Sequence, residues 1–178
     1  MTVPPSPEMP EAPGSSERWA WLADTYWYVP EITLPALQVT NLRNPDVRIV
    51  QDQTLWHLER FDSGYVFGSC RASLDGGDFQ DLVMFGSVTP PGDVLLSFAP
   101  RDPVDASLRS GITVAAMTTG IGRMVRHQGG WAFLMQMTGG TSAVSVSHWS
   151  YMLQSTPDDP SWTSIPGLPG MTLDEAFG

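Results

Sequence analysis

The sequence predicts a mainly β protein, an antiparallel up-and-down β-barrel of about eight strands with a short N-terminal helix. Two observations carry this prediction. Glycine (17) and proline (16) are plentiful among the 178 residues, and turn signals such as Asp75-Gly76-Gly77 and Pro90-Pro91-Gly92 recur at even spacing. The segments between these turns are rich in β-branched, aromatic or methionine residues, which is the pattern of consecutive hairpins. Closing the strands into a barrel removes the two exposed edges that an open sheet would leave.

The predicted elements follow one another along the chain. Trp19, Leu22 and Tyr26 stand at helical spacing and predict a helix of two or three turns. A first strand is expected around residues 27–29. Seven further strands are expected within residues 47–61, 65–73, 79–89, 93–99, 112–127, 131–138 and 143–154.

At this length one domain is expected, with a tail at each end. Residues 1–18 hold five prolines and no apolar run, so we expect a flexible N-terminal arm. Residues 19–154 are expected to form the β-barrel domain. Residues 155–178 are expected to form an irregular C-terminal extension that wraps across the body or a partner subunit.

Composition excludes several classes of function. The formal net charge is -10, which disfavours nucleic acid as a partner. All nine basic residues are arginine, so no lysine-dependent mechanism is available. Cys70 is the single cysteine, which rules out an intrachain disulfide. Since no signal peptide and no membrane-spanning run is visible, we expect a cytoplasmic protein without a membrane partner.

Alternation along the predicted strands separates two faces and suggests a ligand pocket. The strand after Gly130 places four large apolar side chains on one face: Trp131, Phe133, Met135 and Met137. Residues of the same character on other strands are Trp56, Tyr65 and Phe67. These seven are predicted to line a pocket for a small apolar or aromatic molecule. The competing interpretation is ordinary core filling, for which methionine is well suited.

The pattern of residues 19–154 resembles the calycin superfamily, the lipocalin- and avidin-like barrels. A Trp-rich entry segment, a meander of hairpins and the late strand Gly-Gly-Trp131-Ala-Phe133-Leu-Met135-Gln-Met137 carry the resemblance. The lipocalin Gly-x-Trp opening is absent, so the resemblance implies the barrel architecture and no more. An α+β cone fold is the second choice. Such folds usually begin with a largely helical segment, whereas this sequence offers only one short helix.

Four polar residues are the candidates for chemistry. His57 and Glu59 project from one strand face and would act as an oriented base, or else form a surface ion pair. His148 is aligned with valines on the last strand and is either a catalytic group or a hydrogen-bonded core histidine. Arg71 shares a face with Tyr65 and would anchor an anion or a carbonyl, or else point to solvent.

The combined prediction is a barrel that encloses one apolar or aromatic small molecule. As an enzyme it would be a cofactor-independent isomerase, dehydratase (a lyase) or cyclase in biosynthesis, with His148, His57 and Glu59 as catalytic residues. The alternatives are a carrier or sensor of a hydrophobic metabolite without turnover, and a structural homo-oligomer. No cofactor and no metal are expected, because the three histidines lack metal-binding spacing.

Overall fold

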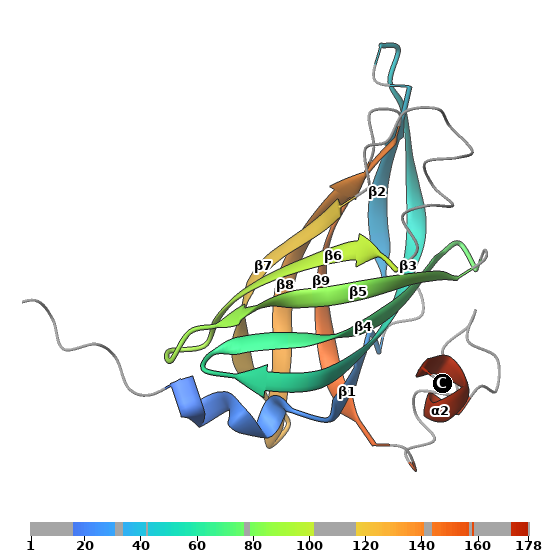
Figure 1. Ribbon diagram of the computed structural model, residues 1–178. Helices are drawn as coiled ribbons and strands as arrows, with labels where there is room; N and C mark the ends of the chain where they lie inside the picture. The colour runs from blue at the N-terminus through green and yellow to red at the C-terminus, as the bar shows by residue number, and fades with distance from the viewer. Residues whose placement is uncertain are drawn as a thin grey trace, which may run out of the picture.

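The protein is described here from a computed structural model (Figure 1). The structure describes residues 16–30, 34–41, 43–76, 79–101, 117–140, 144–156, 158 and 172–177. Within them lie a short 3-10 helix, nine strands and one short α-helix. Their bounds are η1 (Ser16–Leu22), β1 (Thr25–Tyr28), β2 (Pro35–Thr40), β3 (Asp46–Asp62), β4 (Tyr65–Leu74), β5 (Gln80–Val88), β6 (Asp93–Pro100), β7 (Met117–His127), β8 (Gly130–Gly140), β9 (Val144–Ser155) and α2 (Leu173–Phe177).

The strands form a closed antiparallel barrel. From β3 to β9 each strand pairs with the next along the chain, as in a meander. β1 and β2 both pair with β3 on one side and with β9 on the other. They therefore occupy a single strand position in tandem, so the barrel has eight positions although it has nine strands. This confirms the predicted eight-stranded barrel closed by pairing of the last strand with the first.

Two local elements differ from the prediction. β2 was not expected, because its short sequence begins at Pro35, soon after Pro30, and gives no clear strand pattern. The N-terminal helix is a 3-10 helix rather than a longer α-helix, and Tyr26 already belongs to β1. Of the two predicted tails the structure describes only residues 16–18, 155–156, 158 and 172–177, and the last six include helix α2.

One end of the barrel is closed by η1 and packed solid (Figure 1). Trp19 of η1 is buried, and its indole Nε1 donates to the carbonyl oxygens of Thr89 (2.9 Å) and Pro90 (3.1 Å). Above it, the rings of Trp27 and Phe133 meet edge to face with their centroids 4.6 Å apart. Buried leucines and methionines fill the rest of this half. The β2–β3 hairpin extends beyond the opposite end (Figure 1).

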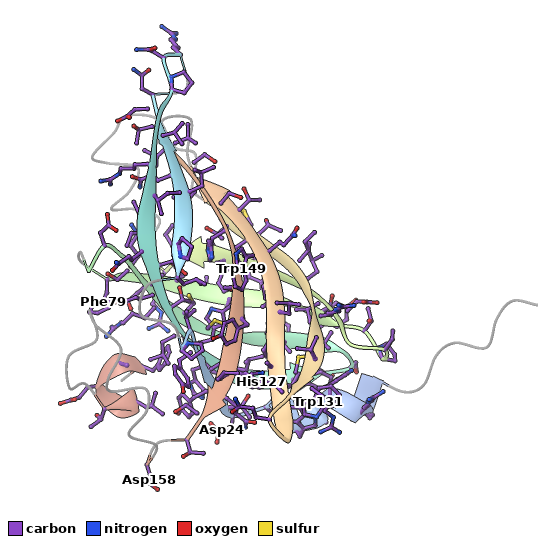
Figure 2. All side chains as sticks on the ribbon, turned by 180° about the vertical axis from the view of Figure 1, so that it is seen from behind. Asp24, Phe79, His127, Trp131, Trp149 and Asp158 are labelled. Carbon is purple, nitrogen blue, oxygen red and sulfur yellow. The ribbon has the colours of Figure 1, made fainter. Side chains whose placement is uncertain are left out.

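The outer surface differs from one side of the barrel to the other. Helix α2 packs on it through Leu173 and Ala176, which are buried against Tyr28 and Leu55. On β6–β9 the outer face keeps large apolar side chains exposed, namely Leu95, Ile121, Leu134 and Trp149. Figure 2 shows Trp149 midway along the barrel wall.

None of the helices in the described part of the chain is long and apolar enough to cross a membrane.

A candidate ligand cavity in the open half of the barrel

The half of the barrel away from η1 is hollow. It contains a cavity of about 490 Å³ that residues of all eight strand positions line. Its wall is mainly apolar, with a few polar side chains among the aliphatic ones. The lining residues include Gln38, Asp52, Trp56, Cys70, Phe98, Met137, Val146, His148 and Met152.

The packed aromatic cluster forms the floor of this cavity. Trp56 on β3 and Phe98 on β6 are both almost completely buried, with ring centroids 5.5 Å apart. Met137 and Met152 line the cavity beside them. Because methionine side chains adapt to irregular shapes, this floor can adjust to ligands of different shape.

His148 and Asp52 form a buried pair in the cavity wall. Nδ1 of His148 lies 3.7 Å from Oδ2 of Asp52, and both side chains are shielded from solvent. That distance is longer than a hydrogen bond, and Nδ1 has no hydrogen-bond partner. The carboxylate of Asp52 accepts from Thr54 Oγ1 at 3.2 Å. A movement of less than about 1 Å would therefore join the two residues directly.

The interrupted first strand accounts for this placement. Asp52 lies on β3 and His148 on β9, and the strand position between them holds β1 and β2 in tandem. Beside the break, the Asp52 amide donates to the Leu34 carbonyl oxygen at 3.0 Å. Ala36, buried at the start of β2, has only a methyl group. The small side chain leaves room for the two polar groups to approach.

Burial sets the electrostatics of Asp52. Loss of hydration raises the pKa of the Asp52 carboxyl, because the charged form is disfavoured in a low dielectric. The charge on His148 and the hydrogen bond from Thr54 act in the opposite direction, but the pKa stays raised. A carboxyl of this kind exchanges protons closer to neutral pH than an exposed one does.

Cys70 is a second ionisable group of the cavity wall. Burial first, and then the charge of Asp52, raises the pKa of its thiol well above 9.0. The indole N–H of Trp56 offsets part of this effect, although it lies outside hydrogen-bonding geometry with any partner. Cys70 is thus a neutral, buried side chain.

The structure places five of the predicted site residues inside the barrel. Trp56, Phe133, Met135 and Met137 are buried, and His148 faces the cavity. Of these, Trp56, Met137 and His148 line the cavity itself. Phe133 and Met135 belong to the packed core and do not line this cavity.

Trp131 lies at the closed end rather than at the cavity. It is partly buried against the core, with its ring centroid 4.9 Å from that of Trp19. The guanidinium of Arg126 lies 3.9 Å from its ring centroid on the other side. Figure 2 shows Trp131 beside η1. Trp131 thus helps to hold η1 against this end of the barrel.

The predicted inward direction of Tyr65 and Phe67 is wrong, and Arg71 shares their outer face, so it is not an anchor in this cavity. These residues lie on the outer face of β4, where Tyr65 is 59% and Phe67 37% exposed. The Arg71 Nε donates to Asp81 Oδ1 at 2.8 Å on the outside. The inner face of β4 carries Val66, Gly68, Cys70 and Ala72 instead. The large aromatic side chains of the interior come from β3, β6 and β8 instead.

His57 and Glu59 also lie outside the barrel and are not a pair. His57 stacks on Tyr26 with centroids 4.2 Å apart, and its Nε2 lies 3.1 Å from Asp24 Oδ1. Glu59 accepts a hydrogen bond from Ser69 Oγ, which in turn accepts from Arg101. The two residues share the outer face, as predicted, but each contacts other side chains, and a register shift between Leu58 and Arg60 falls at this point of β3.

Asp52 is the main residue of the site that the sequence analysis passed over. It stands near the start of a long strand, and nothing in its immediate neighbours distinguishes it from other acidic residues. The one available signal was its even spacing from Trp56 and Leu58, which places the three on one face. Its partner lies on a distant strand, so the pair becomes visible only in three dimensions.

The described residues contain no cluster of three or more His, Cys, Asp or Glu side chains that could hold a metal ion. The polar groups of the cavity are instead suited to hydrogen bonding and proton transfer, since they combine an imidazole with a carboxyl of raised pKa.

The fold and the site together define a closed eight-stranded antiparallel barrel with an internal cavity. No protein-family model, no curated protein and no solved structure matches the chain. The barrel architecture is therefore established by the structure alone, and a relationship to the calycin superfamily stays a prediction.

Proposed function

We propose that the barrel binds one small, largely apolar molecule in its open half, and that His148 and Asp52 transfer a proton to or from that molecule. The observation that carries the proposal is the buried His148–Asp52 pair in the wall of a cavity of about 490 Å³.

The cavity has the properties of a small-molecule site. Its volume falls within the range of about 300–1,000 Å³ that is common for such sites. Its wall combines an apolar floor at Trp56, Phe98 and Met137 with a few polar side chains on the sides. Apolar surface supplies binding energy, while isolated polar groups orient the ligand.

The buried pair supports chemistry without a cofactor. Isomerisation, dehydration and cyclisation need a shaped substrate and one or two acid–base groups. His148 would move the proton, and Asp52 would orient the imidazole and balance its charge. The floor residues would hold the substrate in a reactive conformation. An isomerase, lyase or cyclase of biosynthesis fits this arrangement.

A carrier or sensor of a hydrophobic metabolite is the second candidate, because the same cavity would serve binding without turnover. A purely structural oligomer ranks third. The exposed apolar face on β6–β9 favours association, but assembly alone requires no hollow interior. Association of the barrels is compatible with either of the first two functions.

Binding is tested with N-phenylnaphthylamine, a neutral dye that fluoresces in apolar surroundings. The parent protein should bind it. Val146→Trp should weaken binding at least about tenfold by filling the cavity, whereas Ser147→Trp, at the exposed neighbouring position, should not. Equal binding by both variants would place the dye outside the barrel and remove the basis of the proposal.

Proton transfer is tested with β-tetralone in deuterated water. The parent protein should accelerate deuterium exchange at the carbon next to the carbonyl, as measured by mass spectrometry. His148→Gln keeps hydrogen bonding but cannot shuttle a proton, so it should bind the ketone and lose most of the acceleration. If the ketone binds and the parent protein gives no acceleration, the carrier function is the correct one.

A further inference from the structure

The charges of the cavity wall are unbalanced. Among the described residues that line it, the ionisable side chains are Asp52, Cys70 and His148, and none is an arginine. The chain contains no lysine. The thiol of Cys70 is neutral, and the imidazole of His148 is next to the Asp52 carboxyl. Among the described lining residues His148 is the one basic side chain, and Asp52 already lies beside it, so a carboxylate or phosphate in this cavity would compete with Asp52 for that single imidazole.

Arg48, the arginine that contacts a lining residue at the described part of the rim, does not supply the missing cation. Arg48 stands near the mouth, where its Nε donates to Gln38 Oε1 at 2.6 Å. Its Nη1 lies 3.9 Å from Asp75 Oδ2, and the side chain is 59% exposed. The guanidinium is therefore already engaged with an amide and a carboxylate, and water screens its remaining field.

Two buried nitrogen atoms of the lining residues make no hydrogen bond, although one of them lies near the Asp52 carboxyl. Nε1 of Trp56 and Nδ1 of His148 are buried without a hydrogen bond. The indole nitrogen can only donate, and a buried donor without an acceptor is unfavourable. The nitrogen is covered in the structure, so a ligand oxygen such as a carbonyl would satisfy this donor once the Trp56 ring turns it toward the cavity. The neighbouring floor of Phe98 and Met137 is apolar and calls for a hydrocarbon body.

We propose that the cavity selects neutral, largely apolar molecules that carry a carbonyl oxygen, that it rejects their carboxylate counterparts, and that Asp52 sets this choice. The inference rests on the proposed function, because it concerns the ligand of the same cavity. Asp52 acts as a specificity-determining residue: its carboxyl occupies the wall where an anionic ligand group would have to be placed.

The test compares naphthyl methyl ketone with naphthoate, two probes of the same ring system and similar size. Isothermal titration calorimetry measures both affinities at about pH 8, a pH at which naphthoate is ionised. The parent protein should bind the ketone at least about tenfold more tightly than the carboxylate. Asp52→Asn should reduce this difference to less than about threefold, mainly by improving the binding of naphthoate.

A matched control separates local charge from the net charge of the chain. Asp24→Asn removes one negative charge from an outer position that is 84% exposed, and it should leave the preference unchanged. Asp52→Ser provides a second neutral, hydrogen-bonding variant in case Asp52→Asn does not fold.

The outcomes separate the two proposals. If neither probe binds the parent protein, the proposed function itself is wrong. If both bind with similar affinity, the selection for neutral ligands is wrong and the binding function remains. If the parent protein prefers the ketone and the neutral variants at Asp52 keep that preference, Asp52 does not determine it.

Discussion

Asp52 and His148 meet inside the barrel although they lie on strands that are not neighbours. Nδ1 of His148 lies 3.7 Å from Oδ2 of Asp52 across the strand position that β1 and β2 share. That position is interrupted between Tyr28 and Pro35, next to Asp52. The break in the first strand and the buried polar pair therefore belong to one arrangement, and disturbing either should affect the cavity.

The first prediction concerns the pH dependence of stability. The pKa of Asp52 is raised in the folded state, so the folded protein binds more protons than the unfolded chain between the two pKa values. Stability contributed by this group is therefore lost as the pH rises through the folded pKa. Relative to Asp52→Asn, the parent protein should gain stability as the pH falls from about 8 toward about 4.

Urea unfolding at several pH values measures this difference. Asp46→Asn, at an exposed position at the start of β3, is the control and should show no such trend. A parent protein that loses stability relative to Asp52→Asn on acidification would mean that the folded state favours the carboxylate.

The second prediction compares two aromatic residues on the same face of β8. Phe133 is completely buried between Trp27 and Trp56, so Phe133→Ala should lower the free energy of unfolding by about 3–5 kcal/mol. Trp131 is only partly buried at the closed end, and Trp131→Ala should cost less. Urea denaturation of both variants gives the order, and the reverse order would make the Trp19–Trp131 contact the stronger anchor.

The third prediction concerns the one thiol of the chain. Because burial raises the pKa of Cys70 well above 9.0, the thiolate that reacts with iodoacetamide should be scarce at about pH 8. Labelling of the native protein, followed by intact mass, should be at least about a hundredfold slower than labelling in denaturant. Native labelling as fast as that of the unfolded chain would show an open, hydrated site.

The fourth prediction uses a glycine on the inner face of β4. A Cβ at Gly68 would collide with the backbone carbonyl of His57 on β3, so the two strands can approach closely only without a side chain. Gly68→Ala should destabilise the barrel by about 1–3 kcal/mol. Gly130→Ala is a fair control, since a Cβ there meets nothing closer than 3.7 Å. Similar melting temperatures for the two variants would contradict the close approach.

The sequence was sufficient to predict the order of the strands and the closure of the barrel. Turn signals such as Asp62-Ser63-Gly64 mark the ends of strands directly, because only certain residues adopt the required backbone angles. Ser63 and Gly64 both have positive φ in the structure. The meander then follows, since strands joined by tight turns pair with their neighbours.

Alternation along a strand, by contrast, separates two faces without saying which one is inside. On β4 the face with Tyr65 and Phe67 has the larger apolar side chains, but it points outward. Interior volume decides the matter. Trp56, Phe98 and Phe133 supply the large side chains of the interior, and β4 faces them with small residues such as Gly68 and Cys70.

What the sequence determined by itself is the local pattern: most of the strands, the turns between them, and the division of each strand into two faces. The tertiary structure alone decided which half of the barrel is packed and which is hollow, and that His148 meets Asp52 there. The physical reason is that turns and alternation depend on neighbours in the chain. A cavity and a buried polar pair depend instead on the volumes and charges of residues that closure brings together from distant strands.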